Sequence, residues 1–145
     1  MGDRMSFEFI QLLAERKLLR IKPNRKLVLK EIKAAKTDLE DAKESLERNK
    51  FKWATIQGYY SMFHSARALI FNKGYREKSH YALLVALREL LSDELERSFI
   101  QSFEEGMYLR QEADYGLKFS ESSALDIIEN AEKFLKKVMI ILKII

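Results

Sequence analysis

Two groups of side chains in this sequence could carry chemistry, and the first lies on one face of a helix predicted to begin at Phe51. Its members follow one another at intervals of three or four residues and therefore share a face. They are Trp53, Gln57, Tyr60, His64, Arg67 and Phe71. The polar groups of this face need partners if the helix is central. Two interpretations stay open. The face is a polar pocket that stacks and hydrogen-bonds a nucleobase, or Tyr60 and His64 bond within the protein while Arg67 extends to solvent.

The second group surrounds Arg110, close to the predicted end of a later helix. Asp114 follows Arg110 by one helical turn, and Tyr115 comes directly after it. The Asp114 carboxylate can pair with the guanidinium as a structural latch. It can equally hold Arg110 toward a phosphate, which a guanidinium binds through two parallel hydrogen bonds. The residues alone leave both interpretations open.

The composition argues against a metal or cofactor site. The chain has no cysteine, and His64 and His80 are its two histidines. A Glu-x-x-His pair, Glu77 to His80, spans a predicted loop and a helix start, whereas a di-iron bundle needs two such pairs within helices. No glycine-rich phosphate-binding motif occurs. We therefore expect no metal ion and no cofactor.

Charge is unevenly distributed along the chain. The net charge is +4 at pH 7, yet nine lysines and arginines between Arg16 and Lys36 stand against Glu31 alone. Between Glu89 and Asp126, ten acidic residues stand against three basic ones. The basic stretch could attract phosphate groups, or it could be an ordinary solvated helix face.

Hydrophobic spacing predicts helices along most of the chain, with apolar residues alternately four and three apart in the longest of them. The predicted helices cover 6–20, 25–49 and 51–71, then begin at Ser79, at Ser92 or Asp93, and at Ser122 or Ser123. Gly74 is expected to end the central helix in a left-handed conformation. No segment has the period of a strand, and residues 75–78 are predicted to form a loop.

These elements predict an all-α fold, an antiparallel up-and-down bundle of four to five helices with a short N-terminal helical arm. We expect one domain over residues 1–145, with an arm at 1–24 and a bundle at 25–145. The arm could cover the bundle or exchange with a partner chain.

Nothing in the sequence indicates a membrane protein. No apolar run reaches the roughly 18 residues of a membrane span, and no signal peptide is apparent, so we expect a cytoplasmic protein. Residues 1–6 match the short N-myristoylation pattern, which is a loose one.

Three ordered segments resemble the HEPN domain family, and in particular its small stand-alone archaeal and bacterial members. They read W-A-x-x-x-x-Y-Y-S-M-F-H-S-A-R-A-L-I from Trp53, G-Y-R-E-K-S-H-Y-A-L-L from Gly74 and L-R-Q-E-A-D-Y-G from Leu109. With the arm, F-E-F-I-Q-L-L-A-E-R-K-L-L-R-I-K-P, the resemblance covers nearly the whole chain. It implies a homodimeric helical bundle and a nucleotide- or RNA-associated role. It also implies a minimal nucleotidyltransferase as partner in a toxin–antitoxin-like pair.

Many members of that family are metal-independent endoribonucleases, whose motif is an arginine, four to six residues and then a histidine, with two copies meeting across the dimer. Here Arg110 is in place, but Tyr115 occupies the histidine position and no histidine follows it. A tyrosine, with an ordinary pKa of about 10, is a weak base at pH 7. A divergent ribonuclease would therefore use Arg110 with His64 or Tyr115.

The resemblance gives Arg110 the role of phosphate contact and Asp114 that of its orienting residue. Tyr115 is expected to donate a hydrogen bond or to accept a modification from the partner enzyme. Tyr60, His64 and Arg67 would support this site from the central helix. A non-catalytic helical interaction module, with Arg110 and Asp114 as a latch, is the third alternative.

Overall fold

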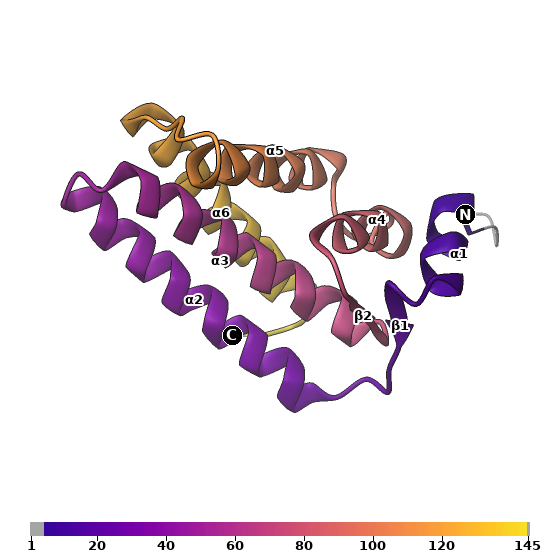
Figure 1. The fold of residues 1–145 in the computed structure, drawn as a ribbon. Helices are drawn as coiled ribbons and strands as arrows, with labels where there is room; N and C mark the ends of the chain where they lie inside the picture. Colours follow the sequence, from indigo (N-terminus) through magenta and orange to yellow (C-terminus); the bar gives the residue numbers. More distant parts are fainter. Residues whose placement is uncertain (1–4, 145) are drawn as a thin grey trace.

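The computed structural model describes residues 5–144, and helices make up most of it (Figure 1). The elements in chain order are α1 (Phe7–Ala14), β1 (Leu18–Arg20), α2 (Arg25–Glu47), α3 (Phe51–Asn72), β2 (Tyr75–Glu77), α4 (His80–Leu90), α5 (Arg97–Asp114) and α6 (Glu121–Ile141). The predicted all-helical bundle with its N-terminal helical arm is confirmed. Among the described helices, none combines the length and the apolar composition that crossing a membrane requires. Residues 1–4, which carry most of the N-myristoylation pattern, lie outside the described residues.

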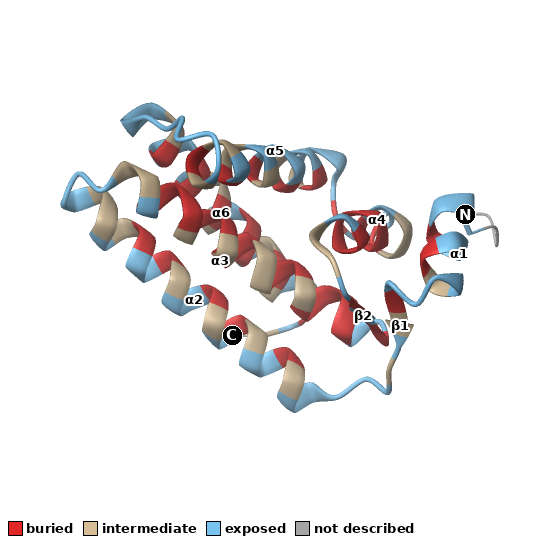
Figure 2. Ribbon diagram, viewed as in Figure 1, coloured by how far each residue is buried: buried red, intermediate tan, exposed pale blue. Residues whose placement is uncertain are grey.

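Helix α3 is the central element, since it contacts α2, α4, α5 and α6. It is buried around much of its circumference, whereas α2 is buried along one stripe only (Figure 2). Its approach to α6 depends on Gly58, because a Cβ atom at that position would lie 3.0 Å from Cγ2 of Ile127. Gly74 ends the helix with a φ of 88°, as the sequence predicts.

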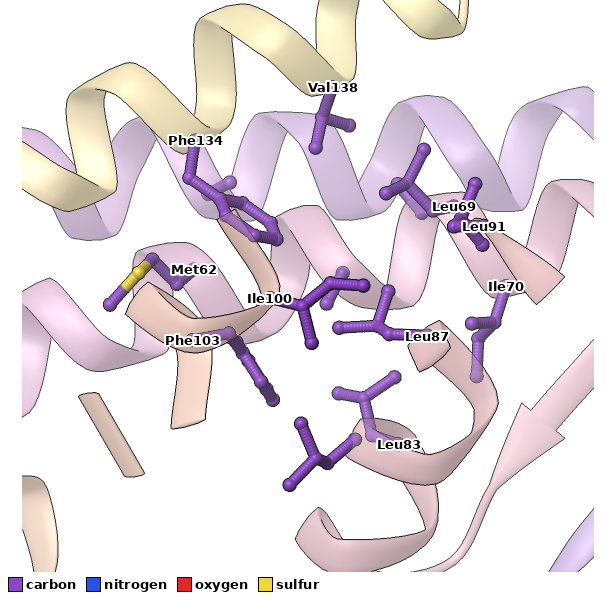
Figure 3. Close-up of a cluster of buried hydrophobic side chains, with 14 of the residues drawn as sticks. Met62, Leu69, Ile70, Leu83, Leu87, Leu91, Ile100, Phe103, Phe134 and Val138 are labelled. Carbon is purple, nitrogen blue, oxygen red and sulfur yellow. The ribbon is translucent and has the colours of Figure 1, made fainter. Parts of the chain in front are cut away.

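The core lies where α3, α4, α5 and α6 meet (Figure 3). Met62 and Leu69 from α3 face Leu87 from α4, Phe103 from α5 and Phe134 from α6, and all five side chains are 0–1% exposed. Leucine and aromatic side chains of this size stabilise a fold by about 2 kcal/mol each when fully buried. The helices that carry Arg110 and its neighbours are therefore held in place by a well-packed core.

Two short strands correct the prediction that no strand would form. β1 and β2 pair antiparallel, with Leu18 opposite Glu77 and Arg20 opposite Tyr75. The predicted arm helix stops early because Arg16 adopts a left-handed φ of 59°, and the predicted loop at 75–78 is mostly strand. Three residues are too few to show the alternation of a strand, and the two strands lie far apart in the sequence.

Two predicted helix starts are also displaced. α5 begins at Arg97 rather than at Ser92 or Asp93, because buried Leu91 and Leu95 hold the intervening residues in a turn closed by a 2.8 Å hydrogen bond from Leu95 N to Leu91 O. α6 begins at Glu121, since the cap is Ser120 rather than Ser122 or Ser123. The Ser120 hydroxyl accepts from the backbone N–H of Ser123, whose hydroxyl in turn accepts from the N–H of Ser120.

The arm packs against its own chain. Phe9 and Leu12 on α1 are 0% and 7% exposed, and α1 contacts α4. Leu18 on β1 is 1% exposed, so the strand pair also contributes to the core.

Candidate functional site

Arg110 is largely enclosed although it lies near the end of α5. The residue is 8% exposed, and its Cζ lies 5.4 Å from the ring centroid of Tyr59, 5.8 Å from that of Tyr60 and 5.8 Å from that of Tyr115. One turn earlier, Gly106 lets α5 approach α3 closely, because a Cβ there would lie 2.6 Å from Cε of Met62. The sequence thus places a permanent positive charge against three aromatic rings, which attract it through their π faces.

The hydrogen-bonding capacity of Arg110 is only partly used. Its Nη1 lies 3.6 Å from Oδ2 of Asp114, which is an ion pair too long for a hydrogen bond. Its buried Nε has no hydrogen-bond partner within residues 5–144. A buried donor without a partner costs about 1–3 kcal/mol, so an anion that supplied an acceptor here would recover that energy.

His80 joins Arg110 from a third helix. It is the first residue of α4, whose N-terminus is fixed by the Ser79 side chain accepting from the N–H of Ala82. Its Nδ1 lies 2.5 Å from the Tyr59 hydroxyl, and its ring lies 4.7 Å from that of Phe63. We call Tyr59, Tyr60, Phe63, His80, Arg110 and Tyr115 the Arg110 cluster.

Burial and the charge of Arg110 determine the charge states of His80 and Tyr59. Burial, followed by the charge of Arg110, lowers the pKa of His80 below its usual 6.5, so the imidazole is neutral at pH 7. Burial raises the pKa of Tyr59 well above its usual 10.0, an effect that the charge of Arg110 partly opposes. Tyr59 therefore keeps its proton. Its hydroxyl can donate to Nδ1 when the imidazole proton is on Nε2, or accept from Nδ1 in the other tautomer.

The sequence gives no hint of this partnership. His80 lies 30 positions before Arg110 and on a different helix, so no local spacing connects them. Only the packing of α4 and α5 against α3 brings the two side chains to the Tyr59 ring. Glu77 and His80, the sequence pair considered for a metal, face different partners, Arg67 and Tyr59 respectively.

His64 and Arg67 belong to a second polar group on the α2 side of α3. Nδ1 of His64 lies 2.7 Å from Oε1 of Glu31, and its Nε2 lies 3.5 Å from Oδ2 of Asp38. Arg67 lies 3.6 Å from Glu31 through Nη1 and 2.9 Å from Oε2 of Glu77 through Nε. We call these five residues the Glu31 network.

The predicted polar face of α3 is thus divided between two neighbourhoods. Tyr60 contacts Arg110, whereas His64 and Arg67 contact acidic residues of α2 and β2. The Arg67 side chain is 16% exposed and does not extend to solvent. Burial raises the pKa of Glu77 and of Asp38, and the neighbouring Arg67 and His64 respectively oppose that rise. This group is held together by charge pairing across α2, α3 and β2.

Tyr115 and Asp114 form the exposed rim of the Arg110 cluster. Tyr115 is the C-cap residue of α5 and is 75% exposed, while the Asp114 side chain is 35% exposed. A ligand can therefore meet the cluster at the end of α5, where Arg110 offers charge and Tyr115 offers a ring and a hydroxyl. Within the described chain, no group of three or more His, Cys, Asp or Glu side chains is arranged to hold a metal ion.

Comparisons with known proteins agree on one family. Residues 29–142 match the HEPN domain model. A UPF0332 protein of Archaeoglobus fulgidus is 32% identical over 113 residues, which cover 73% of this chain and 87% of that protein. A Methanocaldococcus jannaschii protein named "Putative toxin MJ0605" is 30% identical over 115 residues, covering 77% of this chain and 86% of that protein. A UPF0332 protein of Thermotoga maritima is 31% identical over 112 residues, covering 72% and 82%.

Proposed function

The chain belongs to the HEPN domain family, and from that membership we propose that it is the nucleotide- or RNA-binding component of a toxin–antitoxin-like pair. Its partner in the pair is a minimal nucleotidyltransferase, and the protein itself works as a homodimer. The name of the Methanocaldococcus jannaschii relative, which contains the word toxin, supports this assignment.

One observation carries the proposal, namely the state of Arg110. A guanidinium that is 8% exposed, has an Nε without a partner among the described residues and is surrounded by tyrosine rings is suited to an anionic aromatic ligand. Phosphate oxygens would accept from the guanidinium, and a nucleobase would stack on the exposed Tyr115 ring. In the tautomer with its proton on Nε2, neutral His80 adds a second donor without a second positive charge.

Tyr115 has a further role in the pair. Its exposed hydroxyl is an acceptor for nucleotidyl transfer by the partner enzyme. In that step the phenolic oxygen bonds to the α-phosphorus of a nucleoside triphosphate, the bond to the β-phosphate breaks, pyrophosphate leaves and the phenolic proton passes to solvent. The added phosphate would lie beside Arg110 and neutralise it.

The test is nucleotide binding by calorimetry with wild type, Arg110→Gln and Arg110→Lys. Loss of one charged hydrogen bond, worth about 1.5–3 kcal/mol, predicts binding at least tenfold weaker in Arg110→Gln. Arg110→Lys keeps the charge but loses the planar fork, so it should recover little. Arg88→Gln is the matched control, because Arg88 is an exposed arginine whose Nη2 lies 3.0 Å from Glu104.

Two results count against the proposal. Equal binding by wild type and Arg110→Gln would remove Arg110 from the site. No nucleotide binding by wild type, together with no nucleotidyltransferase recovered with the protein from native lysate, would refute the function. If Arg110→Gln then lowered only the thermal stability, the interaction-module alternative with its Arg110–Asp114 latch would take its place.

The second candidate is a metal-independent endoribonuclease, which the position of His80 favours. In the tautomer with its proton on Nδ1, His80 donates to the Tyr59 oxygen and its Nε2 is free to take a proton. The 2′-hydroxyl of RNA would lose its proton to Nε2 and attack the neighbouring phosphorus. The bond to the 5′-oxygen then breaks, the leaving oxygen takes a proton from water, and a cyclic phosphate remains while Arg110 stabilises the developing charge.

RNA cleavage without metal separates the alternatives. We expect Arg110→Gln and His80→Gln to abolish cleavage and His64→Gln to preserve it, because His64 is held by Glu31 and Asp38. Loss of activity in Tyr115→Phe or His64→Gln instead would transfer the base role to that residue. No cleavage by wild type would eliminate the second candidate.

A further inference from the structure

The first half of α2 exposes a line of lysines that have no acidic partner. Lys26, Lys30 and Lys33 are spaced by four and three residues, so they lie on one face of the helix, opposite the buried Val28–Ile32–Ala35 stripe. All three are exposed, and none forms an ion pair within residues 5–144. Lys22 before them and Lys36 after them are exposed as well. We call Lys26, Lys30, Lys33 and Lys36, together with Lys22 just before the helix, the α2 basic face.

The second half of the same helix is different. Lys43 lies 3.3 Å from Glu132 on α6, and Arg48 lies 3.7 Å from Glu44 one turn before it. Charges there are neutralised by neighbours, whereas those of the α2 basic face are left to solvent. The first half of α2 therefore carries unpaired positive charges, whereas the basic side chains of its second half are paired with acidic ones.

A hollow beside β1, in the segment that precedes α2, contains two more basic side chains. It has a volume of about 360 Å³ and is lined by Arg16 and Arg20 around Leu13, Leu18 and Leu19. Arg20 is held in place, since its Nη1 donates to the Tyr75 hydroxyl at 2.7 Å. A hollow lined by both leucine and arginine side chains suits a flat ring attached to a phosphate.

The charge of this region exceeds that of the whole protein. Nine basic residues and Glu31 give residues 16–36 a charge of +8, against +4 for the chain, so the remaining residues sum to −4. The strand pair and the start of α2 lie at one end of the molecule, while the C-terminal end of α5 lies at the opposite end (Figure 1). An approaching polyanion is therefore attracted to the α2 end.

The composition of the α2 basic face indicates which class of partner it can bind. A protein interface needs an apolar centre, and a membrane-binding helix needs an apolar side. Here Leu29, which is 44% exposed, is a single large apolar side chain among five lysines, so the face fits neither kind of partner well. A phosphodiester backbone needs only spaced positive charges. Lys26 to Lys33 span about 10 Å along the helix at 1.5 Å per residue, which is enough for successive phosphates.

We propose that the α2 basic face and the hollow lined by Arg16 and Arg20 bind the phosphodiester backbone of a nucleic acid strand, with one unstacked base in the hollow. This docking surface is separate from the Arg110 cluster. The inference rests on the proposed function in one respect, because both assume a ligand made of nucleotides. Here that ligand is the polymer rather than a free nucleotide.

The experiment measures binding of a fluorescent 20-nucleotide RNA, and of DNA with the same sequence, by anisotropy as a function of salt. The test variant is Lys26→Gln with Lys30→Gln. The control is Lys133→Gln with Lys136→Gln, which removes the same charge from exposed positions on α6. Each phosphate contact to a single strand contributes about 0.7 to the salt slope, or about fivefold in affinity at 0.1 M salt. We therefore expect the test variant to bind about 25-fold more weakly, with a slope lower by about 1.4.

The outcomes are distinguishable. Weakening of RNA binding alone would identify RNA as the ligand, and equal weakening for DNA would show that the face binds phosphates of either polymer. Binding by the test variant within twofold of the control would overturn the proposal. Binding by wild type to anionic phosphatidylserine vesicles but to neither nucleic acid would also overturn it. The test variant keeps Arg110, so weaker oligonucleotide binding with unchanged nucleotide binding by calorimetry would assign the polymer to this surface. Loss of the difference between wild type and Arg110→Gln in nucleotide binding would count only against the proposed function.

Discussion

Replacing Tyr59 with phenylalanine removes one oxygen from the centre of the Arg110 cluster. That oxygen lies 2.5 Å from Nδ1 of His80, and the Tyr59 side chain is 0% exposed. The ring contacts to Phe103 and Arg110, with centroid distances of 5.7 Å and 5.4 Å, are kept by phenylalanine. The substitution therefore isolates one hydrogen bond between α3 and α4.

The expected cost follows from the state of the two partners. A hydrogen bond of this kind contributes about 1 kcal/mol, and the partner left without it costs further energy according to its burial. Water can reach part of half-buried His80, so we expect a total loss of about 1.5 kcal/mol in the free energy of unfolding. For a protein of this size that is a fall in Tm of about 5 °C. Urea and thermal unfolding followed by circular dichroism at pH 7.5, where His80 is neutral, measure both quantities.

A double-mutant cycle tests the cause. If the bond to His80 accounts for the loss, Tyr59→Phe should be nearly neutral in a His80→Ala background, with a coupling energy of about 1 kcal/mol. Tyr60→Phe is the control, because the Tyr60 hydroxyl has no hydrogen bond among the described residues, and it should change stability by less than about 0.5 kcal/mol. A coupling below about 0.3 kcal/mol, or equal losses for the two tyrosines, would refute the assignment of His80 to the cluster.

Three further results are expected. Glu77→Gln should lower the free energy of unfolding in urea titrations by about 2 kcal/mol, because it removes the charged partner 2.9 Å from Arg67. An unchanged midpoint would show that the pair contributes nothing to stability. Gly58→Ala should cost about 1 kcal/mol by the same method, since crowding of Ile127 at 3.0 Å exceeds the gain in helix propensity, and a more stable variant would contradict this close approach. The His80 imidazole should titrate below 6.5 in NMR spectra. Its contribution to stability is then complete above pH 6.5 and is lost as the pH falls toward its folded-state pKa, so a normal titration would contradict the burial.

Local signals predicted most of the helices. Ser79 caps the start of α4 and Gly74 follows the end of α3 with a positive φ, as their residue types predict. The apolar spacing of α2 and α6 corresponds to the buried stripes of these helices. The strands β1 and β2 escaped prediction because three-residue segments have no measurable period. Their pairing joins the arm to the segment that follows α3, which is a tertiary contact that no local pattern reports.

The candidate site was predictable only along single helices. Arg110, Asp114 and Tyr115 are close in the sequence, and the structure keeps them together at the end of α5. Helical spacing also placed Tyr60 and His64 on one face, but it could not show that this face lies between two neighbours, so that one residue meets Arg110 and the other meets α2. The contribution of α4 depends on how helices pack.

The arm determines how this protein can be shortened. Phe9 and Leu18 are 0% and 1% exposed, and β1 covers the edge of β2. A chain that began at Arg25 would keep every helix that contributes to the Arg110 cluster, but it would expose an apolar surface on α4 and an unpaired strand edge. Such surfaces associate between molecules, so we expect the shortened chain to aggregate even where its remaining helices are intact.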